Sequence, residues 1–225
     1  MINTARHSSV INPLLHQHPI HIIGAGATGS RLFASLVELG FEDISVYDDD
    51  IVESHNLANQ LFVMDDIDKL KVDGLDKWVH QKLGEGLKYG MYIPERLPHK
   101  GIDLDGTVFL LTDTMSSRKE IFDSCLKDNL LVERVIETRM ASSYGNIYSF
   151  DPNKTGDQWL DTLIDDKDAE KSSCGSSISV GATASIIANQ AVWQFMLSLT
   201  DPEATDDIVD VFLQPFCMST RSWEY

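Results

Sequence analysis

Cysteine is scarce in this chain. Three cysteines occur among 225 residues, they are widely spaced, and no two of them form a CxxC pair. The sequence therefore signals neither a disulfide framework nor a four-cysteine zinc site. We expect a reducing, cytoplasmic setting, in which an apolar core rather than covalent cross-links holds the fold.

Positively charged residues and long apolar runs are also few. Lys and Arg number 18 against 35 Asp and Glu, which gives a formal net charge of −17 at pH 7. A field of that sign repels nucleic-acid backbones and anionic membrane surfaces, so we expect neither as a partner. The longest apolar stretch, residues 178–199, is broken by Ser, Gly, Thr, Asn and Gln. No run approaches the roughly 20 apolar residues of a membrane span.

The remaining composition is ordinary for a globular protein. Hydrophobic residues make up 43% of the chain and charged residues 24%, and this length can bury the core of one medium-sized domain. After residue 20, short apolar strands alternate with helical patterns, which is typical of a parallel sheet with helices on both faces. The expected strands are residues 21–23, 44–47, 89–93 and 107–111, and the expected helices are residues 32–39, 68–83 and 116–127.

The pattern changes in the last third of the chain. The expected elements there are two antiparallel strands at residues 130–138 and 146–150, a helix at 180–198 and a last strand at 208–213. We therefore predict a Rossmann-like, doubly wound α/β fold whose mainly parallel sheet ends in antiparallel C-terminal strands. One domain is expected over residues 1–225, with an N-terminal arm (1–18) and a mobile crossover loop (151–177).

A glycine-rich stretch, IGAGATGS, lies between the first strand and the first helix. Its glycines Gly24, Gly26 and Gly29 form a GxGxxG pattern. Such glycines permit a tight turn, a close approach of the backbone to a phosphate, and helix–sheet contact without a Cβ. The main-chain amides of Ala27 and Thr28, at the start of the helix, would then face the anion. The stretch predicts nucleotide binding, with a purely structural turn as the alternative.

Asp48 ends the second strand, where an acidic side chain can accept hydrogen bonds from ribose hydroxyls. Redox dinucleotides and ATP both use that position. The strand, helix and strand alone therefore leave an oxidoreductase and an ATP-dependent enzyme open. The run Asp48–Asp50 is also compatible with a solvated turn.

The segment after the second strand distinguishes these possibilities. It reads YDDDIVESHNLANQLF, followed by DIDKLK, and a Thr-Asp pair follows a later strand. This set resembles the ThiF/MoeB adenylyltransferase superfamily, which includes the activating domains of ubiquitin-activating enzymes. The resemblance covers residues 20 to about 150 and is carried by Gly24, Gly26, Gly29, Ser30, Asp48, Asp50, Val52, Asn56, Leu57, Gln60, Asp66, Ile67, Lys71, Thr112, Asp113 and Arg118.

The resemblance implies a reaction with Mg²⁺ and ATP. In this family a carboxylate, usually the C-terminus of a peptide or ubiquitin-like protein, attacks the α-phosphate to give an acyl adenylate and pyrophosphate. The resemblance places Lys71 over the phosphates, Asp113 on Mg²⁺, Asn56 on phosphate or ribose and Asp48 on the ribose. It further implies a homodimer. The full nucleotide-binding set is Gly24, Gly26, Ala27, Thr28, Gly29, Asp48, Asp50, Asn56, Gln60 and Lys71.

One departure from the family pattern concerns a phosphate-binding cation. Where the family has an arginine in N-L-x-R-Q, this chain has Asn59. Loss of such a cation weakens stabilisation of the charged transition state. Candidate replacements are Arg139, Arg31 and Arg6, the last acting in trans from a second subunit's arm. Arg139 is equally compatible with a structural pairing to Glu137 or Glu133, two acidic residues of the same strand.

The cysteines give a second departure. The zinc-binding CxxC pairs of the family are absent, so we expect no structural zinc. Cys174 lies near where some relatives carry a cysteine for thioester or persulfide transfer, and it is a candidate catalytic thiol. Cys125 lies on an apolar helix face and is expected in the core.

Lys71 and Asp113 each have a simpler, structural interpretation in addition to the catalytic one. Lys71 is compatible with an ordinary charged helix position, and Asp113 with a cap of the helix that begins near Ser116. The leading hypothesis is an ATP-dependent adenylyltransferase that activates a carboxylate. The alternatives are a nucleotide-binding module that has lost turnover with Asn59, and an NAD- or FAD-dependent oxidoreductase.

Overall fold

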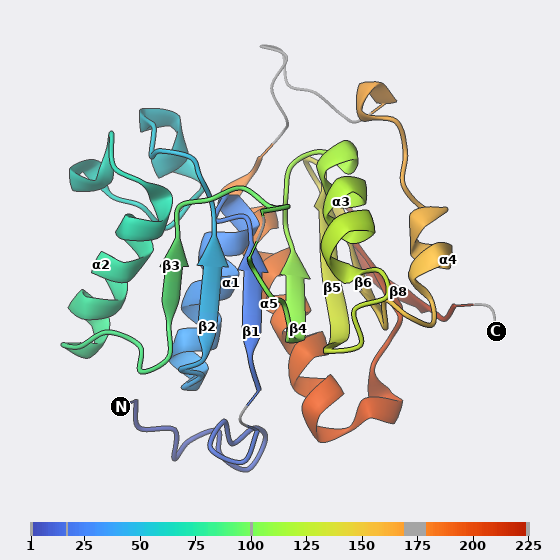
Figure 1. The fold of residues 1–225 in the computed structure, drawn as a ribbon, viewed down its shortest axis with the longest axis horizontal. Helices are drawn as coiled ribbons and strands as arrows, with labels where there is room; N and C mark the ends of the chain where they lie inside the picture. Colours follow the sequence, from blue (N-terminus) through green and yellow to red (C-terminus); the bar gives the residue numbers. More distant parts are fainter. Residues whose placement is uncertain (1, 17, 100, 169–178, 224–225) are drawn as a thin grey trace.

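The computed structural model describes residues 2–16, 18–99, 101–168 and 179–223. They contain one sheet with the strand order β3-β2-β1-β4-β5-β6-β7-β8 (Figure 1). The strands are β1 (Ile20–Ile23), β2 (Ile44–Tyr47), β3 (Met91–Ile93), β4 (Gly106–Leu110), β5 (Val132–Met140), β6 (Tyr144–Phe150), β7 (Ile208–Leu213) and β8 (Phe216–Arg221). The pairs from β3 to β5 are parallel and those from β5 to β8 are antiparallel. The predicted fold class is confirmed.

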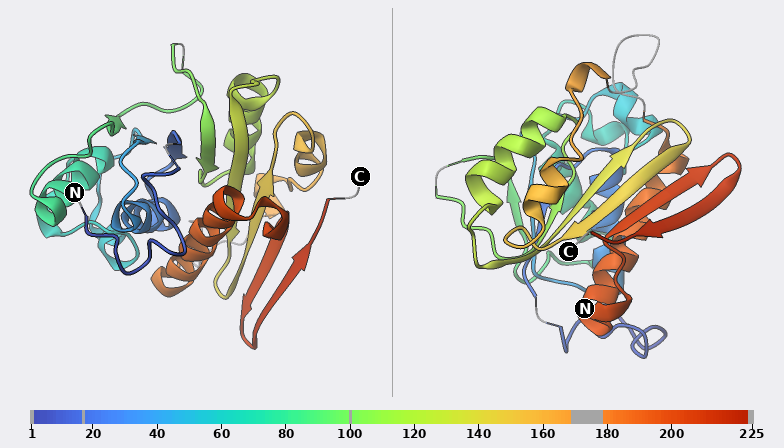
Figure 2. Two further views of the ribbon diagram at one scale, coloured as in Figure 1. Left: turned by 90° about the horizontal axis from the view of Figure 1, so that it is seen from below. Right: turned by 90° about the vertical axis from the view of Figure 1, so that its right-hand side faces the viewer.

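Helices cover both faces of the sheet. On one face, α1 (Ala27–Leu39) and α5 (Gly181–Thr200) pack against each other, while α3 (Met115–Ile121) and α4 (Gly156–Leu160) lie on the other, as Figure 2 shows. The helix α2 (Lys71–Leu83) packs beside β3. Strands β1, β2 and β4 are buried along their whole length. On the face away from α1 and α5, Leu97 and Leu104 of the segment between β3 and β4 help to cover them.

Several boundaries differ from those expected. The helix predicted over 68–83 begins only at Lys71, because Asp68 has a left-handed φ of 65° and Leu70 is extended. The helix expected at 116–127 is α3 followed by a π-helical turn, η3 (Phe122–Leu126). Strand β8 was not expected, because its exposed sequence FCMSTR shows no apolar alternation.

The crossover segment is more structured than a loop. Its helix α4 buries Trp159 completely, with the indole ring 5.1 Å from the ring of Phe122 and 5.0 Å from that of Phe150. The expectation of a loop is therefore wrong over α4, since a large aromatic anchors that helix to the core. The later part, residues 169–178 with Cys174, lies outside the described residues.

The N-terminal arm packs against the end of the sheet at which the parallel strands begin (Figure 1). Ile11 is buried in the core, and a ring nitrogen of His7 lies 3.1 Å from the carbonyl oxygen of Leu39, at the last turn of α1. No helix in the described part of the chain is both long and apolar enough to cross a membrane.

Candidate nucleotide site

The glycine loop follows β1 at the carboxyl edge of the parallel strands. Gly24 has a φ of 102°, and a Cβ at Gly29 would lie 1.9 Å from the carbonyl oxygen of Gly24. A Cβ at Gly26, in contrast, would have no atom within 4 Å. The loop is therefore closely packed at its first and third glycines and open at its second, before α1 begins at Ala27. An open backbone beside a helix N-terminus suits the approach of a phosphate.

Asp48 holds the glycine loop from the end of β2. Its Oδ2 accepts a hydrogen bond of 2.6 Å from the amide of Ala25, and its Oδ1 accepts one of 2.9 Å from the amide of Asp50. The residue is only 9% exposed. Burial raises the pKa of its carboxyl group, although Lys71 and the two amides act in the opposite direction.

Lys71 provides the positive charge next to this carboxylate. It is the first residue of α2, and its Nζ lies 2.5 Å from Oδ2 of Asp50 and 3.5 Å from Oδ1 of Asp48. The side chain is buried, although Asp50 is exposed. Three consecutive aspartates would repel a polyphosphate, so the ammonium group offsets part of their charge.

The segment between β2 and α2 brings polar side chains to the loop. In the 3₁₀ helix η1 (Ser54–Ala58), Asn56 is buried and its Oδ1 accepts a hydrogen bond of 2.8 Å from the amide of Glu53. Ser30 of α1 accepts a hydrogen bond of 3.2 Å from the amide of Leu61. The side-chain oxygens of Asn59 and Gln60 are buried without a hydrogen-bond partner among the described atoms.

Asp113 follows β4 on the other side of the glycine loop. It is exposed, and no hydrogen bond joins its side chain to the described part of the chain. The neighbouring Thr112 lies close to the loop, since a Cβ at Gly24 would be 3.4 Å from the Thr112 amide nitrogen. Asp113 therefore offers a free carboxylate beside the glycine loop, which suits a hard cation such as Mg²⁺.

Below Asp113, a buried ion network joins α3, β5 and α4. Glu137 is fully buried, and Arg118 and Arg139 donate to its carboxylate at 2.7 and 2.9 Å. Arg139 also donates to the carbonyl and hydroxyl oxygens of Thr162, at 2.6 and 2.8 Å. These bonds correspond to the structural pairing of Arg139 with Glu137. Burial lowers the pKa of Arg118, while Glu137 acts against that shift.

A further acidic residue at this edge was missed from the sequence. Asp166, in the crossover segment, accepts hydrogen bonds from the amides of Met115 and Ser116 at 2.6 and 3.3 Å. Asp166 therefore caps the N-terminus of α3, and this helix begins two residues after Asp113. Hydrogen bonding to Ser116 lowers the pKa of Asp166. The acidic run around residue 166 shows no periodicity that would have revealed a cap in a distant helix.

The structure brings most of the predicted nucleotide-site residues to one edge, with two cations elsewhere. Arg6 is next to His7, whose ring lies against the last residue of α1, whereas the glycine loop precedes the first turn of this 13-residue helix, so Arg6 is too far from the loop. Arg139 lies within the ion network described above. Arg31, in contrast, lies beside Asn59, with its Nε donating to the Asn59 carbonyl oxygen at 3.2 Å.

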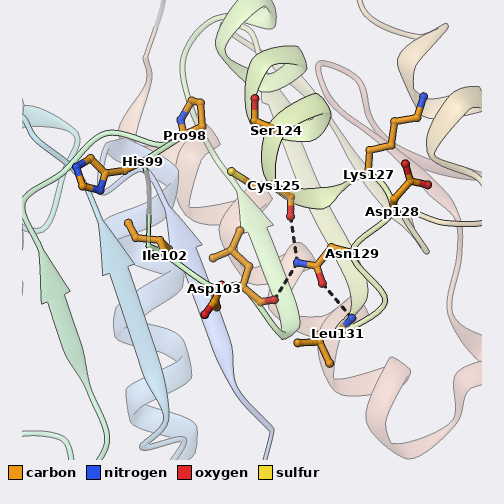
Figure 3. Close-up of a pocket in the computed structure, with 11 residues that line it drawn as sticks. Pro98, His99, Ile102, Asp103, Ser124, Cys125, Lys127, Asp128, Asn129 and Leu131 are labelled. Carbon is orange, nitrogen blue, oxygen red and sulfur yellow. Dashed lines mark hydrogen bonds between the residues drawn. The ribbon is translucent and has the colours of Figure 1, made fainter.

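A shallow cavity of about 630 Å³ lies away from this edge (Figure 3). It is bounded by the loop that begins at Pro98 and by the segment from Ser124, in η3, to Leu131, close to where β4 and β5 begin. Cys125 lines it, and partial burial raises the pKa of this thiol. Cys125 also packs against the core formed by α3 and β5, so the structure places it at the rim of the core rather than wholly inside it.

The order of elements and the glycine loop are those of a Rossmann-type α/β protein. Beyond that class, the model of the ThiF family matches residues 12–215, and the chain belongs to this family. Among curated proteins, none matches the chain.

Solved structures with similar folds share little sequence with this chain. E. coli MccB has a TM-score of 0.73 and 16% identity, over 95% of this chain and 64% of that one. MccB with ATP has a TM-score of 0.70 and 13% identity, over 95% and 66%. PaaA has a TM-score of 0.69 and 18% identity, over 92% and 64%. At these identities the likeness shows the fold alone, and this chain spans less than two thirds of each of these proteins.

Proposed function

We propose that this protein is an ATP-dependent adenylyltransferase that activates the terminal carboxylate of a peptide or ubiquitin-like protein. The observation that carries the proposal is the position of Asp48, Lys71 and Asp113 around an open glycine loop at one edge of the sheet. ThiF family membership supports it. So does the fold shared with MccB, which has been crystallised with ATP and with MccA.

The reaction follows from the charges at this edge. A carboxylate oxygen of the acceptor forms a bond to the α-phosphorus of ATP, and the bond from that phosphorus to the bridging oxygen of pyrophosphate breaks. The products are an acyl adenylate and pyrophosphate, with no change in oxidation state. Negative charge moves onto the leaving group, so oriented amides and cations should provide most of the stabilisation.

Each residue has a defined task in this proposal. The amides of Ala27 and Thr28 face the phosphates, and Asp48 binds the ribose while its Oδ2 holds the loop. Lys71 balances the aspartates and binds phosphate, and Asn56 orders the turn from which Gln60 reaches the site. Asp113 would hold Mg²⁺, which neutralises phosphate charge when it is bound.

Asn59 supports a second candidate function. Without the family arginine, a nucleotide-binding interaction module that lacks turnover would retain the same glycine loop. An oxidoreductase is a weaker alternative, because Lys71 and Asp113 would have no task in hydride transfer.

ATP–pyrophosphate exchange tests the proposed reaction. Peptides with a free C-terminal glycine carboxylate should support exchange, whereas the same peptides with a C-terminal amide should not, because no oxygen nucleophile remains. A protein that binds ATP but exchanges with none of the carboxylate peptides would favour the binding module.

Homodimerisation stays a prediction from the family resemblance, and light scattering of the 25.2 kDa chain would test it.

A further inference from the structure

Another arginine lies against Asn59, the residue that stands where the family has an arginine. Arg31, on the second turn of α1, donates from Nε to the carbonyl oxygen of Asn59 at 3.2 Å. Its Nη2 would lie 3.3 Å from a Cβ built on Gly181, the first residue of α5. The guanidinium group therefore lies between the turn at Asn59 and the N-terminus of α5.

This location is electrostatically unusual for an arginine. Helix N-termini carry a partial positive charge, and neither α1 nor α5 has an acidic residue in its first turn. Within the described residues, no carboxylate forms an ion pair with Arg31, and its terminal nitrogens make no hydrogen bond. By contrast, Arg118, Arg139 and Arg221 each bind a carboxylate. Among the described residues, no carboxylate therefore pairs with the Arg31 guanidinium itself.

The amide side chains beside Arg31 are not fully hydrogen-bonded. Asn59 and Gln60 each bury a side-chain oxygen that has no partner among the described atoms. The Asn59 side chain donates only a long hydrogen bond, 3.3 Å, to the carbonyl oxygen of Ser179. Buried amides are normally satisfied. Because both atoms are acceptors, they can receive a hydrogen bond from a hydroxyl group or a water molecule but not from a phosphate oxygen, and phosphate would be bound by the Arg31 guanidinium.

We propose that Arg31 is the phosphate-binding cation that replaces the family arginine at Asn59. This inference rests on the proposed function, since it assigns a partner to the polyphosphate of ATP. The planar guanidinium stays charged at all working pH values and can donate two parallel hydrogen bonds to phosphate oxygens. Because Nε already donates to the carbonyl oxygen of Asn59, Nη1 and Nη2 are the atoms that would donate to the pyrophosphate leaving group.

Binding measurements with three probes test this assignment. Calorimetry would compare tripolyphosphate, ATP and adenosine on the wild type, on Arg31→Ala and on the double variant Arg31→Ala/Asn59→Arg. Arg31→Ala should weaken tripolyphosphate and ATP about 10- to 100-fold and adenosine less than twofold, because a charge-assisted contact to phosphate is lost. In the double variant, Asn59→Arg should restore most of the lost affinity, because it returns an arginine at the position where the family has one.

The control is Arg221→Ala, on β8 at the far edge of the sheet, which should leave all three affinities unchanged. If Arg31→Ala lowered the affinities for adenosine and ATP equally, Arg31 would only hold the turn at Asn59, and the assignment would be wrong. Unchanged ATP affinity in Arg31→Ala would also overturn it. Tripolyphosphate binding that depends on Arg31, in a protein without exchange activity, would contradict the proposed reaction but support this role. A wild type that binds none of the probes would refute both.

Discussion

At the scale of single residues, Asp48 connects two turns of the candidate nucleotide site. Its two oxygens accept the amides of Ala25 and Asp50, which sets the course of the glycine loop and of the following turn. Burial nevertheless raises the pKa of its carboxyl group, so the ionised form that ribose binding requires is disfavoured by the fold. A residue placed at such a cost to stability is typical of a functional site.

Replacing Asp48 with Asn should reveal that cost through pH. Between the unfolded value near 3.8 and the raised folded pKa, the native state holds a proton that the unfolded state has lost. The wild type should therefore lose stability relative to Asp48→Asn as pH rises through this window. Urea denaturation of both proteins from pH 4 to 7 measures the difference. A difference that grows in favour of the wild type would contradict the assigned direction.

Two glycines of the loop, Gly26 and Gly29, should respond differently to an added methyl group. Gly29→Ala places a Cβ 1.9 Å from a carbonyl oxygen and should lower the free energy of unfolding by more than about 2 kcal/mol. Gly26→Ala meets no atom within 4 Å, so stability should change by less than about 1 kcal/mol. Its methyl group should instead lower ATP affinity about tenfold or more, by entering the space for phosphate. Thermal unfolding and calorimetry separate the two effects.

At the scale of secondary-structure elements, the Glu137 network holds Thr112, the residue before Asp113. Arg118 donates from α3 to the carbonyl oxygens of Thr112 and Thr138, at the ends of β4 and β5, and binds Glu137. Trp159 donates to the same carboxylate from α4, at 3.2 Å. Through Arg118, one buried carboxylate thus joins the crossover segment to the turn after β4 that carries Asp113.

Neutralising Glu137 should therefore loosen several elements together. In Glu137→Gln, two arginines lose their buried counter-charge, which should lower the free energy of unfolding by about 3–5 kcal/mol. Glu120→Gln, an exposed change on α3, should stay within about 0.5 kcal/mol of the wild type. Urea denaturation compares them, and a similar stability for both variants would show that the network contributes little.

At the scale of the whole molecule, a net charge of −17 opposes the approach of a polyphosphate. Attraction must then be local. In the proposed site, the glycine loop, the N-termini of α1 and α5, Lys71 and Arg31 would supply it at one edge of the sheet, where they also offset the acidic run Asp48–Asp50. ATP binding should accordingly be sensitive to single charges at this edge.

The sequence predicts those features of the fold and of the candidate site that have a local pattern. The alternation of strands and helices, the glycine loop and Asp48 depend on contacts near in sequence, and the structure has each at the expected element. Contacts between distant segments have no local pattern. The cap of α3 by Asp166 and the approach of Arg31 to Gly181 join residues about 50 and 150 positions apart, so only the folded chain reveals them. The exposed strand β8 was missed for another reason, since it lacks a buried face.

Equilibrium binding of Mg²⁺-ATP to Asp113→Asn tests the central claim most directly. Asp113 is exposed and makes no hydrogen bond within the described chain, so its substitution should leave folding intact. We predict that the wild type binds Mg²⁺-ATP in preference to NAD or FAD, and that Asp113→Asn loses at least about tenfold in affinity. Asp123→Asn, an exposed aspartate on η3, should bind as the wild type does. Preferential binding of NAD or FAD, or unchanged ATP affinity in Asp113→Asn, would contradict the account.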